Sequence, residues 1–420
     1  MGASGTLLER SVAALVDEYL SGLRVVVLNG PRQAGKTTLM RQLIASGDGE
    51  LRNLDDETQL AAARRDPVGF VASGRRPLYL DEVQRAGEPI IRAVKAAVDA
   101  DPTVGQFFLA GSTRFLAEPT MVESLAGRAG VLEVLPFSQG ELAGHRDGFL
   151  HLAFDAPTEL RRLPPLATSR AEYIDLMVRG GFPEASRMTR PRVRRAWFAN
   201  YISAITERDI REMARVNQSS AAATVLRGLA AMSAQMLLST TLSARADLPR
   251  ATVDRYTELL DAVFLIHRLQ PWARNPLTQA VKHAKVYVVD SGLLCHLLGD
   301  SARTLNSPTA RNVGPVAETF VVNELRKQAS WSEVDVALYH YRDSHGNAEV
   351  DVVIEAADGR VIGLEVKAAQ TVTGRDFKHL SRLNDKLGTD FVHGFVVYLG
   401  QHVLSFGANL TAIPLGALWT

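Results

Sequence analysis

The sequence predicts an α/β protein made of three consecutive parts, and three observations lead to this prediction. Within residues 1–150, short apolar stretches alternate with amphipathic stretches of helical spacing, which is the pattern of a parallel sheet covered by helices. From about residue 165 to 280 the pattern is mostly helical. From about residue 284 onward, strand-like stretches return. We therefore expect an α/β domain at 1–160, a helical domain at 165–283 and a second α/β domain at 284–420.

The composition narrows the class of protein. The formal net charge is +1, so the chain has no overall basic field, and any contact with nucleic acid must come from a local patch. The single cysteine, Cys295, excludes an internal disulfide framework and fits a reducing compartment. No apolar run approaches the roughly 18 residues expected of a membrane span. We expect a cytoplasmic protein with no membrane partner.

The first domain contains five apolar stretches that we expect to form strands. They are separated by stretches of helical spacing, such as residues 36–46 and 90–100. The carboxyl ends of parallel strands meet at one edge of a sheet, where ligands of α/β proteins bind. The expected strands are at residues 24–30, 51–55, 76–82, 106–112 and 130–136.

A glycine-rich stretch follows the first expected strand and matches the P-loop pattern G-x-x-x-x-G-K-[ST] without a mismatch. Gly30 and Gly35 let the backbone turn its N–H groups toward phosphates, and the following helix adds its positive end. Lys36 would reach the β- and γ-phosphates, and the Thr37 hydroxyl would bind Mg²⁺. We expect ATP to contact Gly30, Pro31, Arg32, Gln33, Ala34, Gly35, Lys36, Thr37 and Thr38.

Two adjacent acids, Asp81 and Glu82, end the third expected strand. In a P-loop protein, Asp81 would complete the Mg²⁺ shell together with Thr37, and Glu82 would activate the attacking water. The alternative is that the two acids lie at the N-terminus of a helix, where they interact favourably with the positive end of the helix dipole. Their position at the carboxyl end of a strand favours the catalytic interpretation.

Three further residues are candidates for catalysis. Ser112 and Thr113 end the next strand, where the sequence resembles AAA+ ATPases that use a polar residue to orient water; the alternative is a helix N-cap. Arg128 follows Gly127 on an expected loop and is a candidate arginine finger. Such an arginine often acts across a subunit interface, which would make the protein an oligomer. The alternative is a surface arginine.

Together, these stretches and the segments "LAGRAGVLEVLPFS" and "RGGFPEA" resemble a group of prokaryotic AAA-type ATPases. The resemblance covers almost the whole chain. It implies a P-loop ATPase domain of the AAA type and a C-terminal domain similar to nucleases.

Residues 242–272 predict a helix, a turn, a second helix and a strand pair, which resembles a winged helix-turn-helix. In a DNA-binding version, the start of the second helix would face a groove, and an arginine-rich stretch at 190–195 would contact phosphates. The alternative for the winged helix is that it only packs against its neighbours. The alternative for the arginine-rich stretch is a solvated helix face. The groove-facing residues would be Arg250, Thr252, Asp254 and Arg255.

The last domain has acids inside apolar strands. A hairpin would bring Asp351 beside Glu365 and Lys367, and an acid among valines is costly unless it binds something. With Glu318 on a preceding helix, the set resembles the PD-(D/E)xK nuclease core, although Val350 stands where the family has proline. The resemblance implies Mg²⁺ or Mn²⁺ on Glu318, Asp351 and Glu365, with Lys367 as a catalytic residue.

Two alternatives remain for this set: a structural ion-pair network, and nucleic-acid binding without chemistry. We therefore expect an ATPase that couples hydrolysis to nucleic-acid binding or to Mg²⁺-dependent DNA cleavage. The alternative function is an ATP-driven regulatory switch whose C-terminal domain only binds a protein or nucleic-acid partner.

Overall fold

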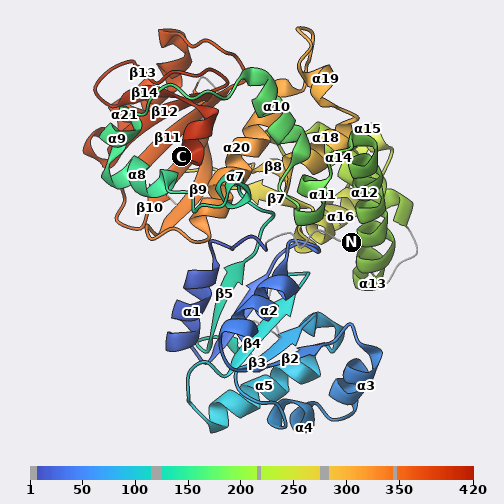
Figure 1. Ribbon diagram of the computed structural model, residues 1–420. Helices are drawn as coiled ribbons and strands as arrows, with labels where there is room; N and C mark the ends of the chain where they lie inside the picture. The colour runs from blue at the N-terminus through green and yellow to red at the C-terminus, as the bar shows by residue number, and fades with distance from the viewer. Residues whose placement is uncertain (1–6, 115–124, 215–218, 275–282, 344–347) are drawn as a thin grey trace. The chain divides into compact units, whose positions relative to one another are not determined.

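The computed structural model describes residues 7–114, 125–214, 219–274, 283–343 and 348–420. The chain forms two compact units (Figure 1). The N-terminal unit contains Met1–Phe137 and Ala262–Phe264, and the C-terminal unit contains Ser138–Asp261 and Leu265–Thr420. The boundary expected near residue 284 lies inside the C-terminal unit. Across the described residues, no helix is both long and apolar enough to cross a membrane.

The N-terminal unit contains a parallel sheet with strand order β2-β3-β4-β1-β5. This arrangement confirms the parallel sheet expected from the alternating pattern. The three central strands are buried along their whole length, as expected of a sheet that is covered on both faces. The strands are β1 (Val25–Asn29), β2 (Glu50–Asn53), β3 (Leu78–Asp81), β4 (Phe107–Gly111) and β5 (Ala129–Glu133).

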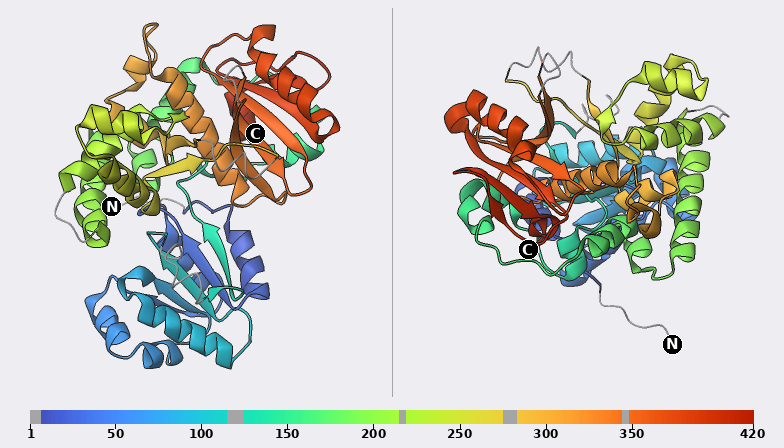
Figure 2. Two further views of the ribbon diagram at one scale, coloured as in Figure 1. Left: turned by 180° about the vertical axis from the view of Figure 1, so that it is seen from behind. Right: turned by 90° about the horizontal axis from the view of Figure 1, so that it is seen from above.

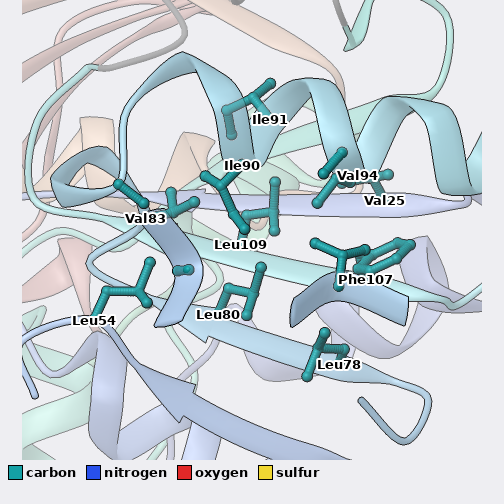
Figure 3. Close-up of a cluster of buried hydrophobic side chains, with 14 of the residues drawn as sticks. Val25, Leu54, Leu78, Leu80, Val83, Ile90, Ile91, Val94, Phe107 and Leu109 are labelled. Carbon is teal, nitrogen blue, oxygen red and sulfur yellow. The ribbon is translucent and has the colours of Figure 1, made fainter. Parts of the chain in front are cut away.

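Helices cover both faces of this sheet, because successive strand side chains point to opposite sides. Val25 packs in the cluster that contains Ile90, Ile91 and Val94 of α5 (Figure 3). Val26 packs in the cluster on the other face, with side chains of α1 and α2. The helices of this unit are α1 (Ala13–Gly22), α2 (Lys36–Ser46), α3 (Glu57–Arg65), α4 (Pro67–Ala72), the short 3₁₀ helix η1 (Val83–Arg85) and α5 (Glu88–Ala100).

The C-terminal unit begins with a mainly helical part. It includes a π-helical turn, η3 (Ile205–Asp209), that continues α12. Its helices before the first strand are α7 (Gln139–Ala143), α8 (Phe149–Asp155), α9 (Pro157–Leu160), α10 (Arg170–Arg179), α11 (Pro183–Arg187), α12 (Pro191–Ala204), α13 (Ile210–Ala214) and α14 (Ser219–Ala231).

A small antiparallel sheet with strand order β6-β8-β7 follows α14. Between β6 and β7 lie α15 and α16, joined by a turn in which Asp247 has a φ of 52°. Leu242, Val253 and Leu260 are buried along this helix pair. The elements are β6 (Gln235–Met236), α15 (Ser239–Ala246), α16 (Arg250–Ala262), β7 (Ile266–Leu269), β8 (Lys285–Val288), α18 (Ser291–Leu298) and α19 (Ala302–Leu305).

The last part of the chain is a mixed sheet with strand order β13-β14-β12-β11-β10-β9. The long helix α20 contacts both β11 of this sheet and α18 of the helical part (Figure 2), and α21 packs on β11 and β12. The elements are α20 (Val313–Ala329), β9 (Val336–Arg342), β10 (Glu349–Ala356), β11 (Val361–Lys367), η4 (Gly374–Phe377), α21 (Lys378–Leu387), η5 (Gly388–Asp390), β12 (Phe391–Tyr398), β13 (Leu404–Ser405), β14 (Leu410–Pro414) and η6 (Leu415–Leu418).

Candidate functional site

The glycine-rich loop lies between β1 and α2, at the carboxyl edge of the parallel sheet. Gly30 has a φ of 155°, and a Cβ atom added there would lie 2.1 Å from the Val134 carbonyl oxygen. Gln33 and Gly35 adopt left-handed conformations, with φ of 60° and 99°. Only glycine fits at the first position, and the turns lead the loop into the N-terminus of α2, where backbone N–H groups are available for phosphate.

The side chain of Lys36 is buried within this loop. Its Nζ donates to the carbonyl oxygens of Gly30 and Pro31, both at 2.8 Å. Burial lowers the pKa of Lys36 to about 8, although the nearby Glu82 and Asp81 carboxylates partly oppose this shift. The ammonium is therefore held by two loop carbonyls and is poorly solvated. A phosphate that binds to it would displace little water.

A buried arginine supports the loop from a distant part of the chain. Arg10 donates to the carbonyl oxygens of Ala34 and Leu135, both at 2.7 Å, and its guanidinium lies 4.6 Å from the centre of the Phe137 ring. Sequence reasoning did not identify Arg10, because nothing in its local pattern distinguishes it from a surface arginine.

Thr37 and Asp81 meet at the carboxyl edge of the sheet. The Thr37 hydroxyl donates to Asp81 Oδ2 at 2.6 Å, and Asp81 is buried. Burial raises the pKa of Asp81, and the hydrogen bond from Thr37 opposes the rise. Hydroxyl and carboxylate oxygens are ligands that Mg²⁺ accepts in proteins. The donor set therefore fits a nucleotide-bound Mg²⁺.

Glu82 is held by two neighbours. It has a left-handed φ of 53°, and its Oε2 accepts a 2.9 Å hydrogen bond from the buried Ser112 hydroxyl. Gln84 Nε2 also donates to Glu82 Oε2 and lies 3.0 Å from Ser112 Oγ. Thr113, the other candidate, is half-buried. Sequence reasoning missed Gln84, although it follows the acid pair by two positions.

The other residues expected to contact ATP belong to the same loop and to the first turn of α2, and their contact with ATP stays a prediction. Pro31 and Ala34 are buried in the loop, whereas Gln33 is exposed. Arg32 is half-buried, and Thr38 is exposed in the first turn of α2.

Arg128 lies at the opposite edge of the sheet from the P-loop. It immediately precedes β5, and its carbonyl oxygen accepts from the N–H of Val25, the first residue of β1. Its guanidinium pairs with Asp99 near the end of α5, at 2.5 and 3.2 Å. Because β1 runs from this edge toward the P-loop, Arg128 does not reach a nucleotide bound by its own chain. Its action on a neighbouring subunit stays a prediction.

In the C-terminal unit, the expected hairpin is confirmed. β10 and β11 pair antiparallel with Val352 opposite Leu364, and Asp351 Oδ2 accepts from the Val366 N–H at 2.9 Å. Lys367 Nζ donates to Glu365 Oε2 at 3.1 Å.

The acids of this cluster perturb one another. Burial, and then the charge of Asp351, raise the pKa of Glu318 to about 7 and that of Glu365 to about 8. Glu318, Asp351 and Glu365 thus share one electrostatic site, as the hairpin and the preceding helix predict.

A residue that sequence reasoning missed occupies this site. Lys285, the first residue of β8, has only 2% of its side chain exposed. Its Nζ lies 3.0 Å from Glu318 Oε1 and 3.4 Å from Asp351 Oδ1. It also lies 2.9 Å from Glu349 Oε1. The available signal was a lysine inside an apolar strand, which is as costly as a buried acid.

These contacts do not fit a metal ion in this arrangement. In the parts of the chain that the structure describes, no group of three or more His, Cys, Asp or Glu side chains is placed to hold one. The oxygens of Glu318 and Asp351 that we expected to bind Mg²⁺ or Mn²⁺ face the ammonium of Lys285 instead. The observed arrangement is an ion-pair network, one of the alternatives left open by the sequence.

Three relatives of similar length are described as uncharacterized proteins. Uncharacterized proteins of Mycobacterium bovis and Mycobacterium tuberculosis are each 28% identical over 424 residues, which cover 98% of this chain and 84% of theirs. An uncharacterized protein of Haemophilus influenzae is 24% identical over 297 residues, or 66% of this chain and 69% of its own.

Among solved structures, the Walker-type ATPase of Pyrococcus abyssi is similar with a TM-score of 0.42 and 15% identity, covering 70% of this chain and 97% of that protein. The RuvB Holliday junction branch migration motor of Thermotoga maritima has a TM-score of 0.30 and 15% identity, covering 62% and 90%.

Family comparisons divide the chain into three segments. Residues 170–304 and 313–418 match two domains of unknown function, DUF8612 and DUF4143. Residues 23–143, which contain the P-loop and the acid pair, match the family described as an AAA domain. The N-terminal segment of this chain is therefore a P-loop domain of the AAA type.

Proposed function

We propose that the N-terminal unit binds ATP with Mg²⁺ and hydrolyses it. One observation carries this proposal: the Thr37 hydroxyl and the Asp81 carboxylate meet beside the buried Lys36, at the end of the sheet where Ser112 holds Glu82. A phosphate loop, a candidate Mg²⁺-binding pair and a candidate base for water therefore lie at one edge of one sheet, which supports phosphoryl transfer to water.

Each group of residues in the site has a separate role in binding or hydrolysis. The loop amides bind the phosphates, and Lys36 exchanges its bonds to Gly30 and Pro31 for bonds to phosphate oxygens. Thr37 and Asp81 would hold Mg²⁺, which when bound neutralises charge on the phosphate oxygens. Glu82 accepts a proton from the water that attacks the γ-phosphate, and the leaving ADP takes the bond electrons.

Nucleotide binding tests the proposal directly. Lys36→Ala should weaken ATP binding in equilibrium dialysis by at least about tenfold, since the loss of one charged phosphate contact exceeds about 1.4 kcal/mol. The matched control is Lys95→Ala, which removes a half-buried lysine of α5 in the same unit. The proposal fails if folded wild-type protein retains neither ATP nor GTP.

We further propose that the C-terminal unit binds nucleic acid, with DNA as the expected form. The order α14-β6-α15-α16-β7-β8 resembles a winged helix-turn-helix, and Arg250 and Arg255 are exposed near the start of α16. The order α20-β9-β10-β11-α21-β12 resembles the PD-(D/E)xK nuclease core. The exposed basic side chains of α12 and its N-cap provide further phosphate contacts: Arg190, Arg192 and Arg195.

The salt dependence of DNA binding tests this assignment. Arg250→Ala combined with Arg255→Ala should weaken binding in fluorescence anisotropy and reduce the slope of log K against log salt. Arg303→Ala, an exposed arginine on α19, is the matched control and should leave the slope unchanged. Equal slopes for all proteins would exclude α16 as the contact helix.

The contacts of Lys285 favour the second candidate function, an ATP-driven switch whose C-terminal unit binds a nucleic-acid or protein partner without cutting it. If this function holds, wild-type protein hydrolyses ATP and cuts no DNA with Mg²⁺ or Mn²⁺. Cleavage that disappears in Asp351→Ala while ATP hydrolysis persists would instead establish a nuclease.

A further inference from the structure

The position of Lys285 joins two separate sheets of the C-terminal unit. Lys285 belongs to β8 of the small antiparallel sheet, whereas Glu349 and Asp351 belong to β10 of the mixed sheet. Glu349 and Asp351 are two positions apart, so both side chains leave β10 on the same face. Glu318 reaches the same ammonium from α20. Carboxylates from two elements therefore meet one cation that comes from a third.

The contacts of β8 occupy one of the two carboxylate oxygens of Glu318. Glu318 Oε1 accepts from Lys285 Nζ at 3.0 Å and from the Tyr287 hydroxyl at 2.7 Å. Lys285 and Tyr287 are also two positions apart on one strand, so both donors face α20. An oxygen that already accepts two hydrogen bonds has no remaining lone pair for a metal.

Three carboxylates compensate the buried charge of the Lys285 ammonium. An isolated buried ammonium is unstable, and Lys285 is compensated by the three acids around it. Oxygens of Glu318, Asp351 and Glu349 lie 3.0, 3.4 and 2.9 Å from its Nζ, so three carboxylates surround one ammonium.

A second observation is a buried carboxylate oxygen near this lysine that has no hydrogen-bond partner. Among the described residues, Glu365 Oε1 is buried and has no hydrogen-bond partner, and only 4% of the residue is exposed. His379 Nδ1 lies 3.7 Å from this oxygen and is paired with the Glu349 carbonyl oxygen at 2.7 Å. A buried carboxylate oxygen without a partner is costly, and a divalent cation that took the place of the Lys285 ammonium would satisfy it.

We propose that Lys285 is an internal lock, whose ammonium stands where a divalent cation would bind between Glu318 and Asp351. In this arrangement the C-terminal carboxylates bind no Mg²⁺ or Mn²⁺, and removal of the ammonium opens the site. This inference rests on the proposed nuclease-like core. It also connects the carboxylates to the expected DNA-contacting helix α16. Strand β7 follows α16 in the chain and pairs with β8, which carries Lys285. A partner that moves this sheet would also move the lock.

Substitution of the lysine tests the lock. Lys285→Met keeps an unbranched apolar side chain of similar length and removes the charge. Full-length, nucleotide-free protein is titrated with Mn²⁺, and free Mn²⁺ is measured by electron paramagnetic resonance. Lys285→Met should gain one bound Mn²⁺ per chain relative to wild type, and Lys285→Met combined with Asp351→Asn should lose it. The melting temperature of Lys285→Met should rise with Mn²⁺, whereas that of wild type should not.

Lys327→Met is the matched control. Lys327 is equally buried, lies on α20 and pairs with Glu324 at 2.6 Å. It should gain no Mn²⁺ that depends on Asp351. If Lys285→Met does not fold, the double variant Lys285→Met with Glu349→Gln takes its place. It removes one carboxylate together with the ammonium, and its Mn²⁺ binding is measured by the same titration.

Three results would overturn the proposal. The first is wild-type protein that already binds Mn²⁺ through Asp351, and the second is folded Lys285→Met that binds none. The third is that neither Lys285→Met nor Lys285→Met with Glu349→Gln folds in saturating Mn²⁺, because Mn²⁺ then cannot replace the ammonium. A Lys285→Met variant that gains Mn²⁺ but cuts no DNA supports the lock and removes only the nuclease part of the proposed function.

Discussion

Replacement of Ser112 by alanine should slow ATP hydrolysis without weakening ATP binding. The Ser112 hydroxyl donates to Glu82 Oε2 at 2.9 Å, and Ser112 is only 2% exposed, so water cannot easily replace the lost donor. A hydrogen bond to a charged group contributes about 1.5–3 kcal/mol. If this energy positions the carboxylate in the transition state, kcat should fall by about tenfold to about 150-fold.

Thr113→Ala is the matched control, because Thr113 is the adjacent hydroxyl and is half-buried. Phosphate release at saturating ATP gives kcat, and titration with a fluorescent ATP analogue gives Kd. Thermal unfolding of each variant separates loss of catalysis from loss of structure, since an N-cap role would lower the melting temperature as well.

Two results would refute this reasoning. One is a Ser112→Ala variant that turns over ATP as fast as wild type. The other is a Thr113→Ala variant that loses more activity than Ser112→Ala, which would show that the neighbouring hydroxyl orients the water.

Three other changes have expected outcomes. Glu82→Gln should bind ATP with near wild-type Kd and release phosphate at least about a hundredfold more slowly, because an amide does not accept the proton of water; normal turnover would exclude Glu82 as the base. Gly30→Ala should abolish ATP retention in dialysis, because its Cβ would lie 2.1 Å from the Val134 carbonyl oxygen; unchanged binding would show that the loop adapts. Burial, and then the charge of Arg161, lower the pKa of His393 from 6.5 to about 4, so only the unfolded chain gains a proton as pH falls through this range. The unfolding free energy should therefore drop by about 2.5 kcal/mol more in wild type than in His393→Gln between pH 7 and 4.5, measured by urea titration of tryptophan fluorescence; equal pH profiles would contradict the shift. All four tryptophans report on the C-terminal unit alone: Trp197, Trp272, Trp331 and Trp419.

The sequence by itself was sufficient to locate the P-loop and to predict the alternation of strands and helices around it. The P-loop is a local pattern of eight residues, and its backbone turns depend on glycines that are visible in the chain. The acid pair was also predictable, because the carboxyl ends of parallel strands meet at one edge. The β10–β11 hairpin followed from a short turn between two alternating stretches.

Only the tertiary structure decided what surrounds these motifs. Arg10 joins the P-loop carbonyl of Ala34 to the Leu135 carbonyl, which lies 125 positions from Arg10 in the chain. Lys285 meets Asp351 from 66 positions away. Arg128 lies beside β1 at the edge far from the P-loop, which the local sequence does not reveal. Contacts of this kind depend on which sheets and helices pack together, and no local spacing records that packing. The same carboxylates therefore predicted a metal site in sequence and form an ion-pair network with a lysine in the folded chain.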